Sequence, residues 1–385
     1  MATTPTVVPI ELGARAYDVR IGSGVLGELG GQMRGVGLGR RAVVVTHPGV
    51  GRHYLAPVMA SLAAAGVEVG VLNLPAGERY KRLATVEKIW AAGLEQRLDR
   101  GGVLVALGGG VLGDMVGFAA ACYYRGISFV QLPTTLLAMV DSSVGGKTGV
   151  NFQGKNLVGA FWQPRLVLAD LDTLATLPAR ELRCGLAEVI KHGAILDLDL
   201  FERLERALVE APTRTGLRLA ACARGTLTPD LARLCVERSC QLKGAVVAAD
   251  EREAGQRAWL NFGHTFGHAL ESVCGYRRLR HGEAVAVGMV LAARLGARRG
   301  DLAPEVETRL ARLCAAVGLP VRVPGGVDPQ ALWAAMLKDK KTRDGTPRLT
   351  LLAGLGRAMV TDDTPAAMIE NLLAEACAEG NDADR

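Results

Sequence analysis

The chain has 385 residues, 49% of them hydrophobic, which is enough for two domains with cores of their own. Its formal net charge is +6, but aromatic residues make up only 4% and the basic residues are spread out, so no nucleic-acid partner is expected. The longest apolar run, residues 284–293, is too short for a membrane span, and the N-terminus resembles no secretory signal. The eight cysteines lack paired spacing, which predicts reduced thiols and a cytoplasmic protein.

The first half of the chain alternates short β-rich runs with amphipathic segments. Strands are predicted over residues 42–46, 67–72 and 103–107, and helices over residues 55–65 and 83–94. This alternation is typical of a parallel sheet whose strands are connected by helices. The first half is therefore expected to form an α/β domain with a Rossmann-like parallel sheet.

The second half reads as a series of helices. Helical periodicity covers residues 180–195, 200–208, 232–247, 265–273, 283–299 and 304–317, and strand character returns only near residues 348–352. The prediction is a mainly α-helical second domain, with domains over residues 1–180 and 181–385. The tail from Gly380 has a composition that predicts disorder.

A glycine-rich loop follows the predicted strand at residues 103–107. Gly108, Gly110 and Gly113 match a G-x-G-x-x-G pattern and precede a helical segment. In that context backbone amides can bind a diphosphate at a helix N-terminus. The loop follows a late strand, and no ribose-binding acid lies about twenty residues on, so an ordinary Rossmann fingerprint is not favoured. A tight strand-to-helix turn without a ligand is the alternative.

A second loop, residues 133–151, combines hydroxyl groups, Asp141, two adjacent glycines and Lys147. Such a loop lets backbone amides and a cation approach a phosphate or a polyol. It is not a nucleotide P-loop, because Asp141 occupies the position of that motif's first glycine.

Three of the six histidines cluster near residue 270. His264 and His268 are four residues apart and share one face of a helix, and His281 with Glu283 opens the next helical segment. Two helices that present histidines in this way predict a metal site. The spacing alone leaves His268 open as a ligand.

Motifs throughout the chain resemble the 3-dehydroquinate synthase family. The matching segments occur in the family's order at residues 75–81, 108–114, 123–126, 140–148, 154–156, 185–191, 250–253, 261–268, 281–283 and 339–341. The resemblance extends over about residues 16–376. It implies an NAD-binding α/β domain followed by a helical metal-binding domain, with NAD and Zn²⁺ or Co²⁺ as cofactors, in a homodimer.

The resemblance implies Glu188, His264 and His281 as metal ligands, a set that leaves positions open for a substrate, as a catalytic zinc requires. His268 would then bind the substrate. His192, four residues after Glu188, is a rival ligand, although a buried histidine in a helix is its ordinary interpretation.

The implied reaction belongs to the shikimate pathway of aromatic amino acid biosynthesis. The family, a carbon–oxygen lyase, converts 3-deoxy-D-arabino-heptulosonate 7-phosphate to 3-dehydroquinate and phosphate. The steps are transient oxidation by NAD, β-elimination of phosphate, reduction, ring opening and intramolecular aldol closure.

This anionic sugar phosphate needs cations at both ends. By resemblance, Lys243 and Arg257 would bind the carboxylate, while Arg125 would reach in from a second subunit. The residues expected around the phosphate are Lys147, Asn156, His268 and Lys340. The residues expected at the ring hydroxyls are Asp141, Lys191, Glu253 and Asn261; together with Lys147 and His268 they form the predicted catalytic set.

The resemblance also implies the NAD-binding residues. These are Gly77, Glu78, Lys81, Gly110, Val111, Leu112, Gly113, Asp114, Thr134, Thr135, Lys147, Lys155, Thr173, Leu174 and Thr176. The chain departs from the family pattern in two places. The loop between Lys147 and Lys155 is one residue shorter, which affects the reach of Lys155 and Asn156. Thr46 stands where the family often has asparagine or aspartate, which affects adenosine contacts.

Three alternatives remain. A related sugar-phosphate cyclase could act on a substrate without a carboxylate, but Lys243 and Arg257 would then be two buried cations without a partner. A metal-dependent polyol dehydrogenase would release NADH, but it would not need the phosphate-binding set. A catalytically silent NAD-binding regulator would not need the three metal ligands. We assign no function to the arginine-rich residues 214–233.

Overall fold

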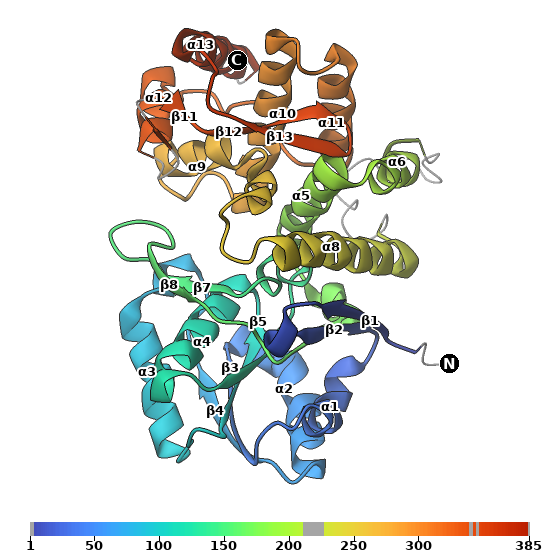
Figure 1. The fold of residues 1–385 in the computed structure, drawn as a ribbon, viewed down its shortest axis with the longest axis vertical. Coiled ribbons are helices and arrows are strands. Elements are labelled where there is room, and N and C mark those ends of the chain that lie inside the picture. Colours follow the sequence, from blue (N-terminus) through green and yellow to red (C-terminus); the bar gives the residue numbers. More distant parts are fainter. Residues whose placement is uncertain (1–3, 211–226, 339–341, 344–345, 384–385) are drawn as a thin grey trace. The chain divides into compact units, whose positions relative to one another are not determined.

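The computed structural model of the protein describes residues 4–210, 227–338, 342–343 and 346–383. The chain forms two compact units (Figure 1). Unit 1 comprises Met1–Pro178 and Pro229–Arg252, and unit 2 comprises Ala179–Thr228 and Glu253–Arg385. The predicted division at residue 180 lies next to the first boundary between the units. The prediction placed residues 229–252 in the second domain, whereas they belong to unit 1.

Unit 1 is built on a seven-stranded sheet in the order β1-β2-β9-β6-β5-β3-β4. The strands are β1 (Thr6–Ile10), β2 (Tyr17–Gly22), β3 (Arg41–Thr46), β4 (Glu68–Asn73), β5 (Val103–Gly108), β6 (Ser128–Pro133) and β9 (Leu166–Asp170). All neighbours pair in parallel except β1, which is antiparallel to β2. Because β3 pairs with β4 on one side and β5 on the other, the strand order reverses there. Ligands of such sheets bind at the carboxyl ends of the strands beside that reversal.

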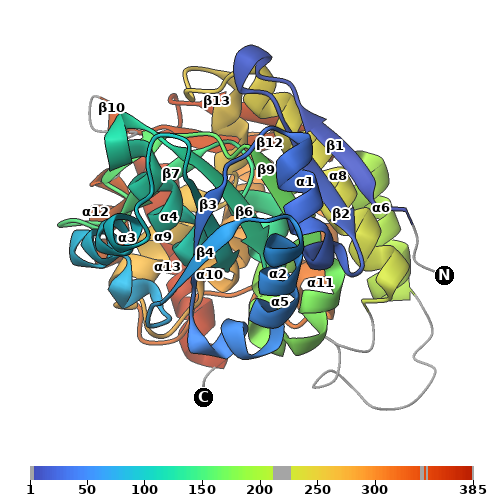
Figure 2. The same cartoon turned by 90° about the horizontal axis from the view of Figure 1, so that it is seen from below.

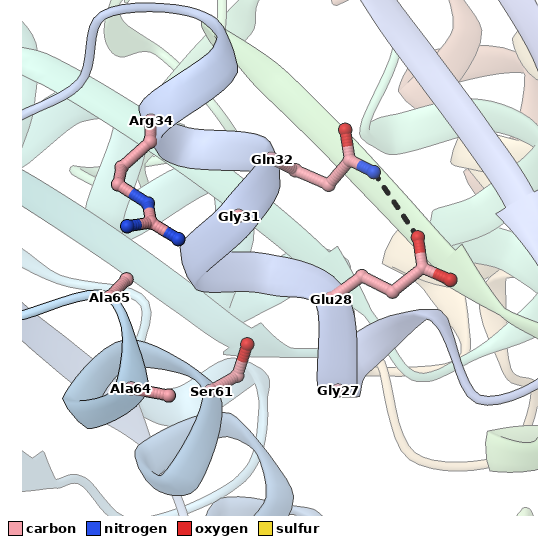
Figure 3. Close-up of a pocket in the computed structure, with 8 residues that line it drawn as sticks. All are labelled: Gly27, Glu28, Gly31, Gln32, Arg34, Ser61, Ala64 and Ala65. Carbon is pink, nitrogen blue, oxygen red and sulfur yellow. Dashed lines mark hydrogen bonds between the residues drawn. The ribbon is translucent and has the colours of Figure 1, made fainter.

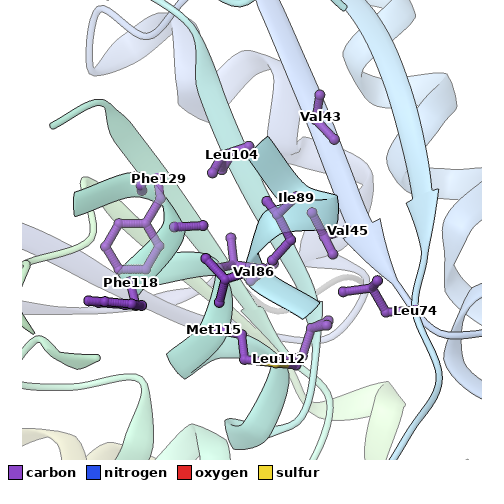
Figure 4. Close-up of a cluster of buried hydrophobic side chains, with 14 of the residues drawn as sticks. Val43, Val45, Leu74, Val86, Ile89, Leu104, Leu112, Met115, Phe118 and Phe129 are labelled. Carbon is purple, nitrogen blue, oxygen red and sulfur yellow. The ribbon is translucent and has the colours of Figure 1, made fainter. Parts of the chain in front are cut away.

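Helices cover both faces of this sheet (Figure 2). They are α1 (Leu29–Gly35), α2 (Pro48–Ala64), α3 (Leu83–Glu95) and α4 (Gly110–Cys122). Alternate residues of a strand point to opposite faces. Val43 and Val45 of β3 accordingly pack with α3 and α4 (Figure 4), whereas Ala42 and Val44 pack with α1 and α2. The predicted parallel sheet with connecting helices is confirmed.

The rest of unit 1 consists of a hairpin, a long helix and short helical turns. These are β7 (Lys147–Val150), β8 (Val158–Phe161), α8 (Pro229–Ala249), η1 (Gly13–Arg15), η2 (Val25–Glu28), η3 (Glu78–Tyr80), η4 (Tyr123–Arg125), the π-helix η5 (Ala138–Ser142) and η6 (Leu171–Thr176). Helix α8 belongs here because its small residues fit this core. Cys240 Sγ lies 3.3 Å from the carbonyl oxygen of Met139, and a Cβ on Gly244 would lie 2.6 Å from Ile10 Cδ1. The periodicity of the sequence predicts the helix but not which core it covers.

Unit 2 is mainly helical, as predicted. Its elements are α5 (Ala179–Leu196), α6 (Leu198–Glu205), the π-helix η7 (Arg206–Glu210), η8 (Gln256–Asn261), α9 (His264–Val273), α10 (His281–Arg299), α11 (Pro304–Ala316), α12 (Pro329–Leu337), α13 (Ala366–Ala383) and the hairpins β10 (Thr342–Arg343) with β11 (Thr346–Pro347) and β12 (Leu349–Gly354) with β13 (Arg357–Thr361). Helix α10 is buried on all sides along most of its length, so it forms the centre of the unit.

The expected disorder of the C-terminal tail is wrong as far as Ala383, where α13 ends. Gly380 packs so closely against the carbonyl oxygen of Val323 that a Cβ would overlap it, and the Asn381 side chain accepts a hydrogen bond from the amide of Gly326 at 2.6 Å. A polar composition does not reveal such contacts. Within the described parts of the chain, we find no helix with the length and apolar character needed to span a bilayer.

Candidate active site

Three helices of unit 2 bring the predicted metal ligands together. Glu188 lies in the middle of α5, and His264 and His281 are the first residues of α9 and α10. The Nε2 atoms of His264 and His281 lie 3.8 Å and 3.6 Å from Glu188 Oε1. Residues far apart in the sequence therefore offer one oxygen and two nitrogen donors to a single point.

Glycines allow these helices to approach. Gly263 precedes α9 in the left-handed region (φ +77°), where only glycine is unstrained. A Cβ on Gly288 of α10 would overlap the carbonyl oxygen of Gly263, and a Cβ on Gly282 would overlap the backbone of Cys184 on α5. The close crossings of α9 and α5 with α10 therefore place the two histidines beside Glu188.

The hydrogen bonds of the histidines fix which nitrogen faces the ligand cluster. His264 Nδ1 lies 3.2 Å from the carbonyl oxygen of Phe262, and His281 Nδ1 lies 3.2 Å from Glu271 Oε2. A carbonyl oxygen and an ionised carboxylate can only accept, so each Nδ1 carries a proton and donates it. Both Nε2 atoms are left with a lone pair directed at the site, which is the form that binds a metal.

The electrostatics of the cluster also fit a cation. Glu188 is fully buried, and neither of its carboxylate oxygens accepts a hydrogen bond from the described residues, although Lys191 Nζ forms an ion pair with Oε2. Burial, together with the charge of Lys191, holds the pKa of His264 well below its usual value, so its imidazole is neutral.

Spacing decides whether these donors can share one ion. Donors about 2.0–2.2 Å from a tetrahedral zinc lie roughly 3.4 Å from one another. The separations of 3.6 Å and 3.8 Å between the histidine Nε2 atoms and Glu188 Oε1 are close to this value. All three donor atoms lie within 4.8 Å of one another. The residues fit a divalent metal of the zinc type.

Glu283 stabilises the start of α10, where His281 lies. Its carboxylate accepts from the backbone amide of Arg280 at 2.8 Å and from the Arg180 guanidinium at 2.7 Å and 2.6 Å. Burial alone would raise the pKa of Glu283, but the hydrogen bonds from Arg180 and Arg280 outweigh it and lower the pKa. Glu283 therefore remains ionised and fixes the first turn of α10 against α5.

Unit 2 also holds the predicted substrate residues near residue 260. The Asn261 side chain donates to Glu253 Oε1 at 2.9 Å. Glu253 has a positive φ of 61°, a strained conformation for a residue other than glycine. Arg257 is 1% exposed and is the largest fully buried side chain, and His268 lies with its ring centroid 5.3 Å from that of His264. Lys340 lies outside the described residues.

In unit 1 the glycine loop lies at the predicted position, between β5 and α4. The N-cap of α4 is Gly109, which has no side chain to accept from the first amides of the helix, so these amides can bind an anion. The hydroxyls of Thr134 and Ser142 are buried without a hydrogen-bond partner among the described residues. A Cβ on Gly110 would lie 2.6 Å from Ser142 Oγ, which places this hydroxyl beside the first turn of α4. Amides and hydroxyls together fit a phosphate group.

Except for Lys147 and Lys155, which lie in the hairpin of β7 and β8, the predicted NAD-binding residues follow carboxyl ends of the parallel strands. Gly77, Glu78 and Lys81 follow β4, the residues from Gly110 to Asp114 follow β5, Thr134 and Thr135 follow β6, and Thr173, Leu174 and Thr176 lie in η6 after β9. This edge of the sheet is where doubly wound folds bind their ligands. Thr46, at the end of β3, donates to the carbonyl oxygen of Leu107 at 2.9 Å, so its side chain connects β3 to β5.

Lys81 organises a polar network at the end of β4. Its Nζ lies 2.5 Å from both Asp114 Oδ2 and Asn156 Oδ1, and its carbonyl oxygen accepts from the amide of Asn151. The Asn151 side chain donates to Glu78 Oε1 at 2.8 Å. Burial raises the pKa of Asp114, and the charge of Lys81 opposes this rise. The structure thus places Asn156, expected at the substrate phosphate, against Lys81; Lys155 lies beside it in the same loop.

Asp141 and Lys243 pair with each other in unit 1. Lys243 Nζ donates to the carbonyl oxygen of Asp141 at 2.7 Å and also to its carboxylate. Lys243 thus lies in unit 1, whereas Arg257, its predicted partner in binding a carboxylate, lies in unit 2. Lys147 at the start of β7 and Arg125 in η4 are both exposed.

A surface hollow of about 350 Å³ lies elsewhere in unit 1, between α1 and α2 (Figure 3). It is lined by Gly27, Glu28, Gly31, Gln32, Arg34, Ser61, Ala64 and Ala65. None of the predicted site residues lies in it, and its side chains show only one mutual hydrogen bond, from Gln32 to Glu28 at 3.2 Å. It has no part in the candidate site.

Two models of known protein families match most of the chain. The model of the 3-dehydroquinate synthase N-terminal domain matches residues 71–184, and the model of the C-terminal domain matches residues 185–342. The chain belongs to the 3-dehydroquinate synthase family. The 3-dehydroquinate synthase of Synechococcus sp. is 49% identical over 370 residues, which cover 95% of this chain and 97% of that protein.

Solved structures of related cyclases share the fold. The structure of 2-epi-5-epi-valiolone synthase from Streptomyces hygroscopicus, with NAD⁺ and Zn²⁺ bound, matches with a TM-score of 0.83 and 31% identity, covering 94% of this chain and 97% of that one. The structure of 2-deoxy-scyllo-inosose synthase with carbaglucose-6-phosphate, NAD⁺ and Co²⁺ matches with a TM-score of 0.81 and 25% identity, covering 96% and 100%.

Within the described parts of the chain, sequence reasoning missed a side chain that hydrogen-bonds to a predicted metal ligand, that of Glu271. It lies seven residues after His264 and three after His268, which places all three on one face of α9. That spacing was visible in the sequence. What the sequence could not show is that α10 crosses this face and brings His281 to Glu271.

Proposed function

We propose that this protein catalyses the formation of 3-dehydroquinate and phosphate from 3-deoxy-D-arabino-heptulosonate 7-phosphate. The observation that carries the proposal is the convergence of Glu188, His264 and His281 at one point in a member of the 3-dehydroquinate synthase family. High identity to curated 3-dehydroquinate synthases over nearly the full chain supports the same activity.

The metal would be held by Glu188 Oε1 and the Nε2 atoms of the two histidines, and NAD by the edge of the sheet that carries the glycine loop. When bound, the metal would polarise a substrate hydroxyl and NAD would accept and return a hydride. Neither His268 nor His192 is needed as a ligand. His192 is fully buried in α5, as expected for a core histidine.

The residues beside the metal ligands would hold and orient the ring hydroxyls. Lys191 is 1% exposed and already pairs with Glu188. Its ammonium would therefore lie close to a substrate hydroxyl bound at the metal and could exchange a proton with it. Asn261 and Glu253 hold each other at 2.9 Å and can respectively donate to and accept from a hydroxyl. Asp141, paired with Lys243, would serve the same purpose in unit 1.

The anionic ends of the substrate would be bound by cations. Arg257 offers a planar fork matched to a carboxylate, and Lys243 adds a point charge. His268, Lys147, Asn156 and Lys340 are proposed for the phosphate. Because Asn156 accepts from Lys81 at 2.5 Å, its amide nitrogen would be the atom that reaches the phosphate.

We also propose a cytoplasmic homodimer in which Arg125 acts in the partner's site. Arg125 is exposed next to Tyr124, which is 48% exposed. Their turn packs on Trp162, and the adjacent Phe161 is 43% exposed. An apolar surface of this kind is typical of an interface. The free cysteines of the described residues suit a reducing compartment.

The reaction can be tested by following phosphate and NADH together. Purified protein is incubated with the heptulosonate phosphate, catalytic NAD and zinc. Phosphate should be released over many turnovers without net NADH, because the same NAD is oxidised and reduced within each cycle. Stoichiometric accumulation of NADH would instead identify a polyol dehydrogenase and refute the proposal.

The similarity to valiolone synthase makes a sister cyclase the second candidate. Arg257 distinguishes the two, because only the heptulosonate phosphate carries a carboxylate that its planar guanidinium fork could bind. Arg257→Lys keeps the charge but loses the fork, and Arg257→Ala loses both. Losing one charge-assisted contact costs about 1.5 to 3 kcal/mol, or roughly ten- to a hundredfold in kcat/KM. This loss should be large on the natural substrate and small on an analogue whose carboxylate is replaced by hydroxymethyl. Equal losses on both would favour the sister cyclase.

A further inference from the structure

Glu271 is a buried acid that the proposed reaction does not use. It is 4% exposed and lies on α9, on the same face as His264 and His268. Its Oε2 is 3.2 Å from Nδ1 of His281, at the start of α10. Burying a carboxylate is unfavourable unless it is hydrogen-bonded, so the contact with His281 helps to stabilise Glu271 in this position.

The contact determines how His281 faces the site. Since a carboxylate only accepts, the proton of His281 resides on Nδ1, and the lone pair on Nε2 points towards Glu188 Oε1 at 3.6 Å. His264 is held in the same way, but by the backbone carbonyl of Phe262 at 3.2 Å. As far as the described residues show, a charged side chain orients Nδ1 of His281, whereas a backbone carbonyl orients Nδ1 of His264.

We propose that Glu271 is a positioning residue of the metal centre: it holds His281 in the orientation and tautomer that bind the ion, and it makes the imidazole a stronger donor. The proposal rests on the proposed metal site. Partners of this kind, behind a metal-bound histidine, typically contribute about 10- to 100-fold to metal affinity. Glu271 also connects α9 to α10, so it strengthens the crossing that forms the site.

His268, Glu271 and His281 could instead form a second metal site, because their donor atoms also lie within 4.8 Å of one another. The geometry favours the positioning role. The 3.2 Å between His281 Nδ1 and Glu271 is a hydrogen-bond distance, and a proton between these atoms leaves no lone pair on Nδ1 for a second ion.

The test is a metal titration of Glu271→Gln and Glu271→Ala against a competing chelator, without substrate. Glutamine keeps an acceptor for Nδ1–H but loses the charge, whereas alanine loses both. The zinc dissociation constant should rise about 10- to 100-fold in Glu271→Ala and by a smaller factor in Glu271→Gln. The visible spectrum of the cobalt-loaded Glu271→Ala protein should also change, because a reoriented His281 alters the ligand field.

Glu307→Gln is the matched control. Glu307 lies in the same unit and accepts from Arg294 Nε at 2.7 Å, but it contacts no proposed ligand. It should lose stability while keeping its zinc affinity and cobalt spectrum. If Glu271→Ala does not fold, the zinc dissociation constants of Glu271→Gln and Glu307→Gln still test whether Glu271 positions His281.

Two outcomes would overturn the proposal. Zinc affinities of both Glu271 variants within twofold of the wild type would show that the contact does not position His281. Two bound zinc ions in the wild type, one of them lost in Glu271→Gln, would make Glu271 itself a ligand. Neither outcome depends on turnover, so a failure of the proposed reaction would be recognised separately.

Discussion

The glycines of the loop at the start of α4 in unit 1 and those at the helix crossings beside the metal ligands in unit 2 lie against different kinds of atoms. In unit 1, a Cβ on Gly109 or Gly110 would meet side chains, at 3.0 Å from Thr135 Cγ2 and 2.6 Å from Ser142 Oγ. In unit 2, a Cβ on Gly282 or Gly288 would overlap backbone atoms of the neighbouring element. A side chain can change rotamer, but backbone within packed helices can move only if the helices separate.

The difference reflects how each unit presents its chemistry. Unit 1 offers backbone amides and loop residues at the ends of parallel strands, so its site tolerates local adjustment. Unit 2 offers side chains from three helices whose donor atoms must converge within a few ångströms. In unit 2 the distance between two helix axes sets the distance between the metal ligands that the helices carry. A glycine at each crossing allows the helices to approach closely and so determines both distances.

The largest expected effect comes from removing the ligands of unit 2. Glu188→Gln, His264→Ala and His281→Ala should each lose bound metal, and activity should fall on the order of a thousandfold or more, because a Lewis acid contributes several kcal/mol to such a reaction. His268→Ala should retain its metal, as measured by metal analysis of the purified protein. A metal-free His268→Ala beside a metal-loaded His281→Ala would show that the ligand set is misassigned.

The second effect tests the glycine comparison directly. Gly288→Ala should lower the free energy of unfolding by about 3 kcal/mol, at the upper end for overpacking, because the obstacle is a backbone carbonyl. Gly110→Ala should change it by less than about 1 kcal/mol, because Ser142 can rotate and alanine favours the helix. Denaturant unfolding of both variants gives the two values.

Gly296→Ala is the control within α10. Its Cβ would lie 3.4 Å from the nearest atom, an ordinary contact, so alanine should stabilise the helix by about 0.5–1 kcal/mol. Gly288→Ala should also weaken metal binding, whereas Gly296→Ala should not. Equal destabilisation by Gly110→Ala and Gly288→Ala would remove the distinction between the glycine loop of unit 1 and the helix crossings of unit 2.

The same distinction explains how far the sequence predicts the protein. The α/β and helical halves followed from periodicity, because β3, β5, α5 and α10 each carry a clear pattern of their own. The family motifs identified Glu188, His264 and His281, which the structure brings together, and the glycine loop at the head of α4. Such local features need no knowledge of packing.

What the sequence did not reveal depends on tertiary contacts. The membership of α8 in unit 1 rests on small residues that match the surface of that core, and a polar tail became the end of α13 through contacts with Val323 and Gly326. The role of Glu271 requires the crossing of α9 and α10. In each case the partner lies far along the chain, and no pattern within one segment indicates it.

The smallest expected effect concerns Glu283, which fixes the start of α10. Glu283→Gln keeps an acceptor for the amide of Arg280 but loses the charge that pairs with Arg180, whose side chain is 46% exposed. Because solvent weakens such a pair, the variant should lose only about 1 kcal/mol of stability at neutral pH.

The pH dependence follows from the sign of the shift. The pKa of Glu283 is lower in the folded protein than its ordinary value of 4.5, so the folded state binds this proton less readily than the unfolded state does. Its contribution is therefore complete above the unfolded pKa and is lost as the pH falls below 4.5 through the folded pKa. The difference in unfolding free energy between wild type and Glu283→Gln, both measured free of metal, should stay constant from pH 7 to about pH 5.5 and shrink towards zero near pH 3.

A difference that persists undiminished at pH 3 would mean that the size of the side chain, and not its charge, stabilises the first turn of α10. Glu283 would then hold His281 by packing, as the glycines hold the rest of unit 2.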